Sequence, residues 1–219
     1  MDPVGEIGVS VVDLLVIAKE PLPGRAKTRL IPPCSPGEAA GLAEAALADT
    51  LEAAAATPAR RHLLVLDGKP GSWVPAGFDV VTQVEGDLAA RLAGAFSHTD
   101  GPALLIGMDT PQLQPALLDP CMQALAGGAQ ALLGMAEDGG YWAIGLARPD
   151  PRVFGGIAMS RGDTGHRQAE RLAELGLTVS ELPRLRDVDT FADALEVAAL
   201  VPDSRFGRAV AALEHPAAA

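Results

Sequence analysis

The segment AKEPLPGRAKTRL, residues 18–30, concentrates positive charge in a chain that is otherwise strongly acidic. It holds Lys19, Arg25, Lys27 and Arg29, although the formal net charge of the chain is −11. The segment lies between a predicted strand and a predicted helix, a geometry that often holds pyrophosphate through backbone N–H groups and cationic side chains. We interpret these four residues as candidate phosphate ligands, with a solvated charged loop as the alternative.

Aspartates follow two other predicted strands. Asp109 ends the apolar run ALLIGMD (103–109), and Asp187 and Asp189 lie in RDVDT, just after a further strand. Ligands of open α/β sheets bind outside the carboxyl ends of the strands. Residues i and i+2 of an extended segment share one face, so Asp187 and Asp189 repel each other unless a cation intervenes. Mg²⁺ suits such a site because it takes one or two carboxylates plus phosphate oxygens, and Mn²⁺ fits equally.

Structural roles could also explain these acids. Asp109 could cap the turn that begins before Pro111. The aspartates of RDVDT could form an exposed acidic turn paired with Arg184 and Arg186.

The segment EDGGYW (137–142) places two acids before a glycine pair. Glycine allows positive φ angles and a close approach of the backbone to a ligand. A tight hairpin turn with Asp138-Gly139 in the turn position is the alternative, and both can hold together.

Short apolar runs alternate with helix-length segments, which predicts βαβ units and a mostly parallel sheet. In the helix over 86–96, Leu88, Leu92 and Phe96 are expected on the buried face. Ser35 or a neighbour and Thr190 with Asp193 are the expected helix caps. We expect strands over 11–19, 62–67, 78–83, 103–109, 129–138, 139–147 and 177–183, and helices over about 36–56, 86–96, 114–126, 164–176 and from about 190.

Length and composition predict one globular domain over residues 1–219. The 219 residues are 48% hydrophobic but only 4% aromatic, so the core must be aliphatic. The ordered core is expected over about 11–212, with the first ten residues and the HPAAA tail disordered. A pI near 4.7 argues against nucleic acid or an anionic membrane as a partner.

Neither a membrane span nor a secretory signal is expected, because no apolar run reaches 18 residues and the N-terminus lacks a basic region. Cys34 and Cys121 show no metal-ligand spacing and are interpreted as free thiols. We therefore expect a cytoplasmic protein.

Six motifs occur in order: AKEPLPGRAKTRL, GDLAARL, GMDTPQL, AEDGGYWAIGL, MSRGDTG and LRDVDTFAD. Together, over about residues 14–200, they resemble a bacterial glycosyltransferase-like family, catalogued as a domain of unknown function and sometimes associated with arsenosugar biosynthesis. That family is similar to the wider GT-A superfamily, which includes the molybdopterin and phospholactate guanylyltransferases. The resemblance implies a GT-A-type, Rossmann-like α/β/α sandwich with a mostly parallel central sheet. A nucleotide-sugar or nucleoside triphosphate and Mg²⁺ or Mn²⁺ are the implied ligands.

The resemblance also implies roles for individual residues. Asp109, Asp187 and Asp189 correspond to metal ligands, and the cations of the first loop correspond to groups that face phosphates. The candidate nucleotide- or phosphate-binding residues are Lys19, Arg25, Lys27, Arg29 and Asp87, and the candidate substrate loop comprises Gly139, Gly140, Tyr141 and Ser160. The chain departs from the expected pattern at Arg161-Gly162, where small or acidic residues would follow Met159-Ser160.

These residues favour a metal-dependent glycosyltransferase that uses a nucleotide-sugar donor and a small-molecule acceptor. Arg25, Lys27 and Arg29 would bind the diphosphate, and Asp109 with its metal would neutralise the leaving group. Asp138 is the candidate acceptor-side base or substrate hydrogen-bond acceptor. One alternative is a guanylyltransferase-like nucleotidyl transfer that releases pyrophosphate, which the paired aspartates of RDVDT suit; another is a non-catalytic nucleotide-binding protein. No prediction of oligomeric state follows.

Overall fold

The computed structural model describes residues 10–213. The expected disorder of the N-terminus and of the HPAAA tail concerns residues that, apart from residue 10, lie outside this range. Seven strands form one sheet in the order β3-β2-β1-β4-β6-β5-β7. Only β6 runs antiparallel to its neighbours β4 and β5, and the other pairings are parallel. The strands are β1 Asp13–Lys19, β2 His62–Asp67, β3 Phe78–Thr82, β4 Ala103–Ile106, β5 Ala131–Ala136, β6 Tyr141–Leu146 and β7 Val179–Leu185.

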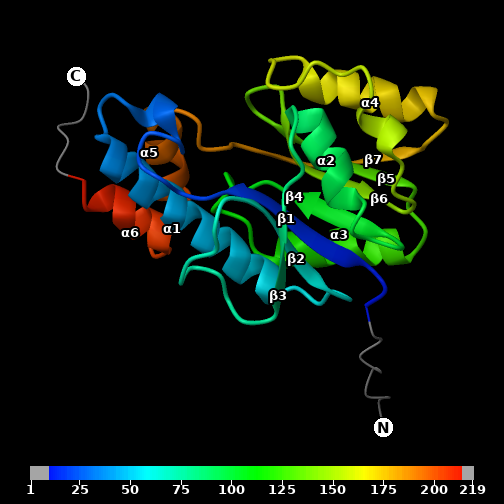
Figure 1. The fold of residues 1–219 in the computed structure, drawn as a ribbon, viewed down its shortest axis with the longest axis horizontal. Helices are drawn as coiled ribbons and strands as arrows, with labels where there is room; N and C mark the ends of the chain where they lie inside the picture. Colours follow the sequence, from blue (N-terminus) through cyan, green and yellow to red (C-terminus); the bar gives the residue numbers. More distant parts are fainter. Residues whose placement is uncertain (1–9, 214–219) are drawn as a thin grey trace, which may run out of the picture.

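Helices cover both faces of the sheet (Figure 1). α1 (Pro36–Ala55) and α3 (Pro115–Ala126) pack on one face, where their leucines and alanines join the apolar side chains of β1 and β4. α2 (Leu88–Phe96), α4 (Thr164–Glu174) and the 3₁₀ helix η2 (Pro151–Phe154) pack on the other. The expected α/β/α sandwich with a mostly parallel sheet is therefore confirmed.

A third apolar cluster lies beside the sheet and contains no strand. It joins η1 (Thr28–Leu30) and the first half of α1 to α5 (Phe191–Leu200) and α6 (Arg205–Ala211). Figure 1 shows these helices gathered at one end of the molecule. Leu30, Val188 and Phe206 are buried together in this cluster, which anchors both the cationic loop and the RDVDT segment.

The helix starts follow the predicted capping chemistry. Ser35 and Glu38 form a capping box at α1, and Thr190 and Asp193 form one at α5. Asp87 caps α2 by accepting a hydrogen bond from the backbone of Ala90 at 2.9 Å.

One prediction about local structure is wrong, and one helix was not predicted. Leu88 was expected on the buried face of its helix, but it is 40% exposed because it stands on the first turn of α2 at the mouth of a cavity. The helix α6 was not expected, because it is short and has Gly207 at its centre. It is formed where Ser204 accepts a hydrogen bond from the backbone of Gly207 at 2.9 Å.

A buried carboxylate fixes the start of β1. Asp13 is fully buried and accepts hydrogen bonds from Arg60 at 2.8 and 2.6 Å and from Arg61 at 2.8 Å. Burial opposes ionisation of Asp13, but the hydrogen bonds from both arginines outweigh it, so the pKa of Asp13 is lowered.

None of the helices within residues 10–213 has the length and hydrophobicity of a transmembrane helix.

Candidate active site

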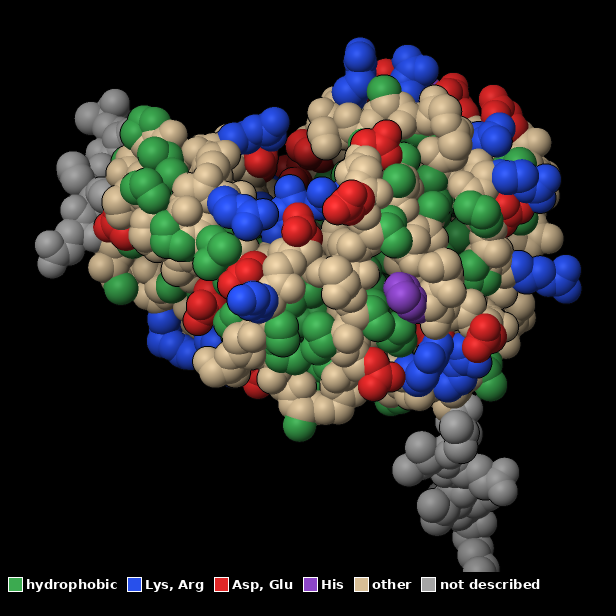
Figure 2. Space-filling model, in the orientation of Figure 1, with side chains coloured by type: hydrophobic (Ala, Val, Ile, Leu, Met, Phe, Trp, Pro, Cys, Tyr) green, Lys and Arg blue, Asp and Glu red, His purple; other side chains and the backbone are tan. Residues whose placement is uncertain are grey.

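A cavity of about 840 Å³ opens where the carboxyl ends of β1 and β4 meet the hairpin of β5 and β6. In Figure 2, acidic and basic side chains lie together around this hollow, between the lobe of α1, α5 and α6 and the helices on the sheet. Most of the predicted site residues line it: Lys19, Arg25, Lys27, Arg29, Asp109, Asp138, Gly140, Tyr141, Ser160, Asp187 and Asp189.

Asp87 and Gly139 are not among the lining residues. The carboxylate of Asp87 is engaged at the N-terminus of α2, where it stabilises the helix. Gly139 instead packs against the loop before α4. The structure therefore gives both residues structural roles, and their predicted contact with ligand stays a prediction.

Lys27 and Asp109 form an ion pair at the floor of the cavity. The distance from Lys27 Nζ to Asp109 Oδ1 is 2.8 Å, and the Lys27 side chain is only 10% exposed. The same ammonium donates to the backbone carbonyl of Val188, whose N–H donates to the carbonyl of Asp109 at 2.9 Å. The loop after β4 and the RDVDT segment are thereby joined side by side.

Asp187 and Asp189 both face this cavity, while Val188 between them is buried in the helical cluster. This is the alternation expected of an extended segment. Asp189 pairs with Arg29 rather than with Arg184 or Arg186. Arg186 has other partners, the carboxylates of Glu137, Asp193 and Glu196. The alternative in which the RDVDT acids pair with neighbouring arginines is therefore wrong.

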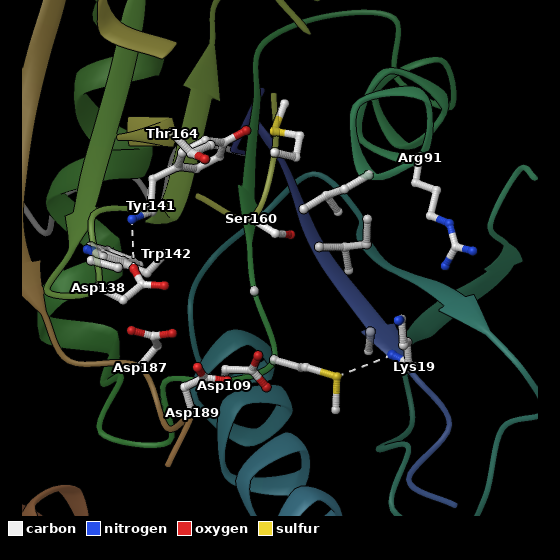
Figure 3. Close-up of a pocket in the computed structure, with 18 of the residues that line it drawn as sticks. Lys19, Arg91, Asp109, Asp138, Tyr141, Trp142, Ser160, Thr164, Asp187 and Asp189 are labelled. Atoms are coloured by element: carbon white, nitrogen blue, oxygen red, sulfur yellow. Dashed lines mark hydrogen bonds between the residues drawn. The ribbon is translucent and has the colours of Figure 1, made fainter. Parts of the chain in front are cut away.

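The acidic groups share one electrostatic environment. Figure 3 shows Asp138, Asp187, Asp109 and Asp189 along the same wall. Burial, together with the charges of Asp138 and Asp109, raises the pKa of Asp187 to about 6, and Lys27 opposes this shift. The charged form of Asp187 is therefore disfavoured in these surroundings unless a cation balances its negative charge.

The EDGGYW turn packs directly against the loop that precedes α4. Gly139 has a φ of +89°, and a Cβ at this position would lie 1.9 Å from the carbonyl oxygen of Gly162. The N–H of Gly165 donates to the carbonyl of Gly139 at 2.8 Å. In the turn itself, Asp138 Oδ1 accepts from the N–H of Gly140 at 2.7 Å. The glycines therefore allow two backbones to meet and orient the Asp138 carboxylate.

Backbone strain is concentrated around the cavity. Within residues 10–213, the residues other than glycine that have a positive φ are Lys27 (50°) and Ser160 (59°), and both line it. Such conformations cost of order 1–3 kcal/mol each and persist where the surrounding structure enforces them, often at functional sites.

Two cations of the first loop are free to bind an anion. Lys19 and Arg25 are exposed, and among residues 10–213 neither has a carboxylate partner. Phosphate oxygens would provide the charge-assisted hydrogen bonds that these side chains lack.

The lining residues that the sequence interpretation did not single out include the polar side chains of Gln83, Arg91 and Thr110. Arg91 bonds Asp67 at 2.9 Å and lies across the cavity from the acidic wall, near Lys19 (Figure 3). The hydroxyl of Thr110 is buried and has no hydrogen-bond partner among the described residues. Arg91 lies in the motif GDLAARL and Thr110 in GMDTP. The signal that could have identified them is their position in the same motifs as the predicted site residues Asp87 and Asp109.

Tyr141 and Trp142 close the side of the cavity formed by β6. Burial raises the pKa of Tyr141, so its hydroxyl stays protonated and donates to Gln168 Oε1 at 3.3 Å. Trp142 donates through Nε1 to the carbonyl of Pro183 at 3.0 Å. These side chains form a fixed wall.

The carboxylates fit a divalent cation by their chemistry. Within residues 10–213, no three His, Cys, Asp or Glu side chains are arranged as a ready-made metal cage. Mg²⁺ needs no such cage, because it is bound by one or two carboxylates with phosphate oxygens and water. Asp109 Oδ1 is buried and has the Lys27 ammonium as its ion-pair partner. Asp109, Asp187 and Asp189 are the residues that would hold the ion.

Solved structures of similar fold include a proposed transferase, a synthetase complexed with CTP and a protein in complex with manganese. A proposed nucleotide-diphospho-sugar transferase from Desulfovibrio desulfuricans G20 is 27% identical, with 91% of this chain and 92% of that chain covered and a TM-score of 0.79. CMP:2-keto-3-deoxy-manno-octonic acid synthetase complexed with CTP is 13% identical, covering 86% and 97%, with a TM-score of 0.57. Rv0371C from Mycobacterium tuberculosis H37Rv, in complex with manganese, is 24% identical, covering 85% and 96%, with a TM-score of 0.51.

The last two similarities concern the fold alone, and no curated protein matches the chain. The fold is that of nucleotide-diphospho-sugar transferase-like proteins. Residues 42–161, more than half of the chain, match the family described as uncharacterized proteins conserved in bacteria (DUF2064). The chain belongs to this family, in agreement with the expected membership of a family catalogued as a domain of unknown function.

Proposed function

We propose that the protein is a metal-dependent glycosyltransferase that transfers a sugar from a nucleotide-sugar to a small-molecule acceptor. One observation carries this proposal: unpaired cations and four aspartates line the same cavity at the carboxyl ends of the strands. This arrangement suits a ligand that combines a diphosphate, a cation and a neutral polar group. The similarity to the proposed nucleotide-diphospho-sugar transferase supports the same choice.

The cations would position the diphosphate. Among the described residues 10–213, Lys19 and Arg25 have no competing carboxylate, so binding a phosphate would replace water rather than one of these residues. Arg29 is 69% exposed and paired with Asp189, which leaves it able to turn toward a ligand at the rim. Held in this way, the diphosphate would direct the sugar toward the acidic wall.

The acids divide into two groups. Asp109, Asp187 and Asp189 would hold Mg²⁺ or Mn²⁺, and such an ion, when bound, stabilises the negative charge of a departing nucleoside diphosphate. Asp138 lies on the same wall, with one carboxylate oxygen fixed by the N–H of Gly140 at 2.7 Å. Its other oxygen would accept a proton or a hydrogen bond from the hydroxyl of the acceptor.

Nucleotidyl transfer is the second candidate. The pair Asp187 and Asp189 brings a second and third carboxylate to Asp109, and several carboxylates around metal ions suit attack on phosphorus. In that reaction the same cations would hold a triphosphate, and a small phosphorylated acceptor would attack with release of pyrophosphate.

Product analysis separates these reactions. The protein is incubated with MnCl₂ and with panels of nucleotide-sugars and nucleoside triphosphates plus candidate acceptors. Release of nucleoside diphosphate supports glycosyl transfer, and pyrophosphate supports nucleotidyl transfer. Binding without turnover in every panel would contradict an enzymatic role and favour a nucleotide-binding protein.

The metal assignment is tested with Asp109→Asn, which we expect to weaken manganese-dependent nucleotide binding at least about tenfold, as loss of a metal ligand does. Its matched control is Asp79→Asn, which removes the same charge from the exposed edge strand β3. Nucleotide affinity that is equal in both variants would refute the metal role of Asp109.

A further inference from the structure

The ammonium of Lys27 stands at the carboxylate that the proposed function assigns to a metal ion. Its Nζ lies 2.8 Å from Asp109 Oδ1 and donates to the carbonyl of Val188, so it bridges the two segments that carry the acids. Apart from this ion pair, the buried Oδ1 atom has no hydrogen-bond partner in residues 10–213. Lys27 also stabilises the charge of Asp187. The single positive charge of Lys27 therefore balances part of the negative charge of Asp109 and Asp187, at the position that a divalent ion would occupy.

The backbone holds Lys27 in this position. Its φ of 50° and ψ of 41° are left-handed, a strained conformation for a side chain with a Cβ. The carbonyl of Lys27 accepts a hydrogen bond from the backbone N–H of Leu30 at 3.0 Å, and Leu30 is fully buried in the same helical cluster as Val188. The side chain is thus directed to Asp109 by packing outside the cavity.

An ammonium and a divalent cation that both approached Asp109 Oδ1 would repel each other at short range. We infer that Lys27 is an internal placeholder: in the ligand-free protein it occupies the cation position at Asp109, and a metal–nucleotide complex displaces it. The nucleotide supplies the phosphate with which the displaced ammonium then pairs, so no charge is left uncompensated. Metal alone offers no such partner.

The placeholder couples the two ligands. Metal alone must break the ion pair of Lys27 and Asp109 and leave the ammonium unpaired, so it binds weakly. Metal with nucleotide exchanges one ion pair for another and binds well. This inference rests on the proposed function only in taking Asp109 as a metal ligand.

Isothermal titration of the full chain tests it, first with MnCl₂ alone and then with UDP or GDP in the presence of MnCl₂. Lys27→Met keeps the length of the side chain and removes its charge. We expect it to bind Mn²⁺ alone about tenfold more tightly, because a partly desolvated ion pair no longer competes. The same variant should bind the diphosphates about tenfold more weakly.

Arg25→Met is the matched control, since it removes one positive charge from the same loop and cavity without touching Asp109. It should weaken diphosphate binding while its affinity for Mn²⁺ alone stays within about twofold, because the charges are separated by screening solvent. Lys27→Gln, which also removes the charge but keeps a polar side chain, is measured alongside to the same expectation in case the methionine variant folds poorly.

The placeholder is refuted if both Lys27 variants bind Mn²⁺ alone no more tightly than the Arg25 variant does. That result would leave the proposed function intact. Unchanged manganese-dependent nucleotide binding in Asp109→Asn would instead refute the metal site itself, so the two failures are distinguishable.

Discussion

Replacing Gly139 with alanine tests how the acidic turn and the loop before α4 hold the cavity together. Two separate costs are expected. Gly139 has a φ of +89°, which an L-residue with a Cβ rarely adopts, and the new Cβ would lie 1.9 Å from the carbonyl oxygen of Gly162. The obstacle is backbone, so no rotamer change can relieve it.

The two costs can be separated with a matched control. Gly156 has a φ of +78° but no atom within 4 Å of the position of its Cβ, so Gly156→Ala carries the backbone strain alone, about 1–2 kcal/mol. Gly139→Ala adds the overlap, and overpacking of this kind costs about 1–3 kcal/mol more. The total of about 2–5 kcal/mol corresponds to a fall in Tm of very roughly 4–20 °C for a chain of this size.

Urea unfolding of both variants measures the difference. The difference in unfolding free energy between them reports the contact of Gly139 with Gly162, and nucleotide binding should weaken in Gly139→Ala because the Asp138 turn must shift. Equal destabilisation of the two variants would show that the backbones do not meet as described.

Two further predictions concern buried acids. Asp13→Asn should lower the unfolding free energy by about 2–3 kcal/mol at pH 7, because the carboxylate between Arg60 and Arg61 is lost. Since the folded pKa of Asp13 is lowered, this difference should shrink as the pH falls below about 4, and a constant difference in urea unfolding from pH 7 to pH 3 would contradict it. Asp187→Asn should raise the Tm of the metal-free protein by about 2–4 °C at pH 8, because it removes an ionised carboxylate disfavoured by burial and by Asp138. The gain should fall by about half at pH 5, where the folded carboxyl is already protonated but the unfolded one is not, and it should vanish only below the ordinary pKa of 3.8; calorimetry that finds the same gain at pH 8 and pH 5 would count against this interpretation.

The local features of the fold could be predicted because their causes lie within a few residues. A capping box needs only a hydroxyl and an acid three residues later, and the box predicted at Thr190 and Asp193 forms, as does the cap predicted at Ser35. Apolar runs bounded by turns gave the strands, and the alternation of extended backbone placed Asp187 and Asp189 on one side with Val188 buried.

The contacts that define the site are non-local, and the sequence did not reveal them. Nothing near Lys27 indicates that it adopts a left-handed conformation or that its ammonium reaches Asp109, because both follow from how Leu30 packs. Similarly, Leu88 follows the helical period of its neighbours, but exposure at its position is decided by the cavity beside α2. Residue types and spacing therefore identified residues that line the cavity. Their ion pairs and their exposure follow from tertiary packing instead.

The strandless cluster of η1, α1, α5 and α6 has a consequence for shortened forms of the protein. No residue of α6 lines the cavity, yet Phe206 is buried in the same cluster as Leu30 and Val188, which belong to the cationic loop and the RDVDT segment. Removing this last helix would leave the sheet and Asp109 in place while releasing the opposite rim. We therefore expect a chain truncated before α6 to bind the proposed nucleotide ligand more weakly, although no side chain of this helix reaches the cavity.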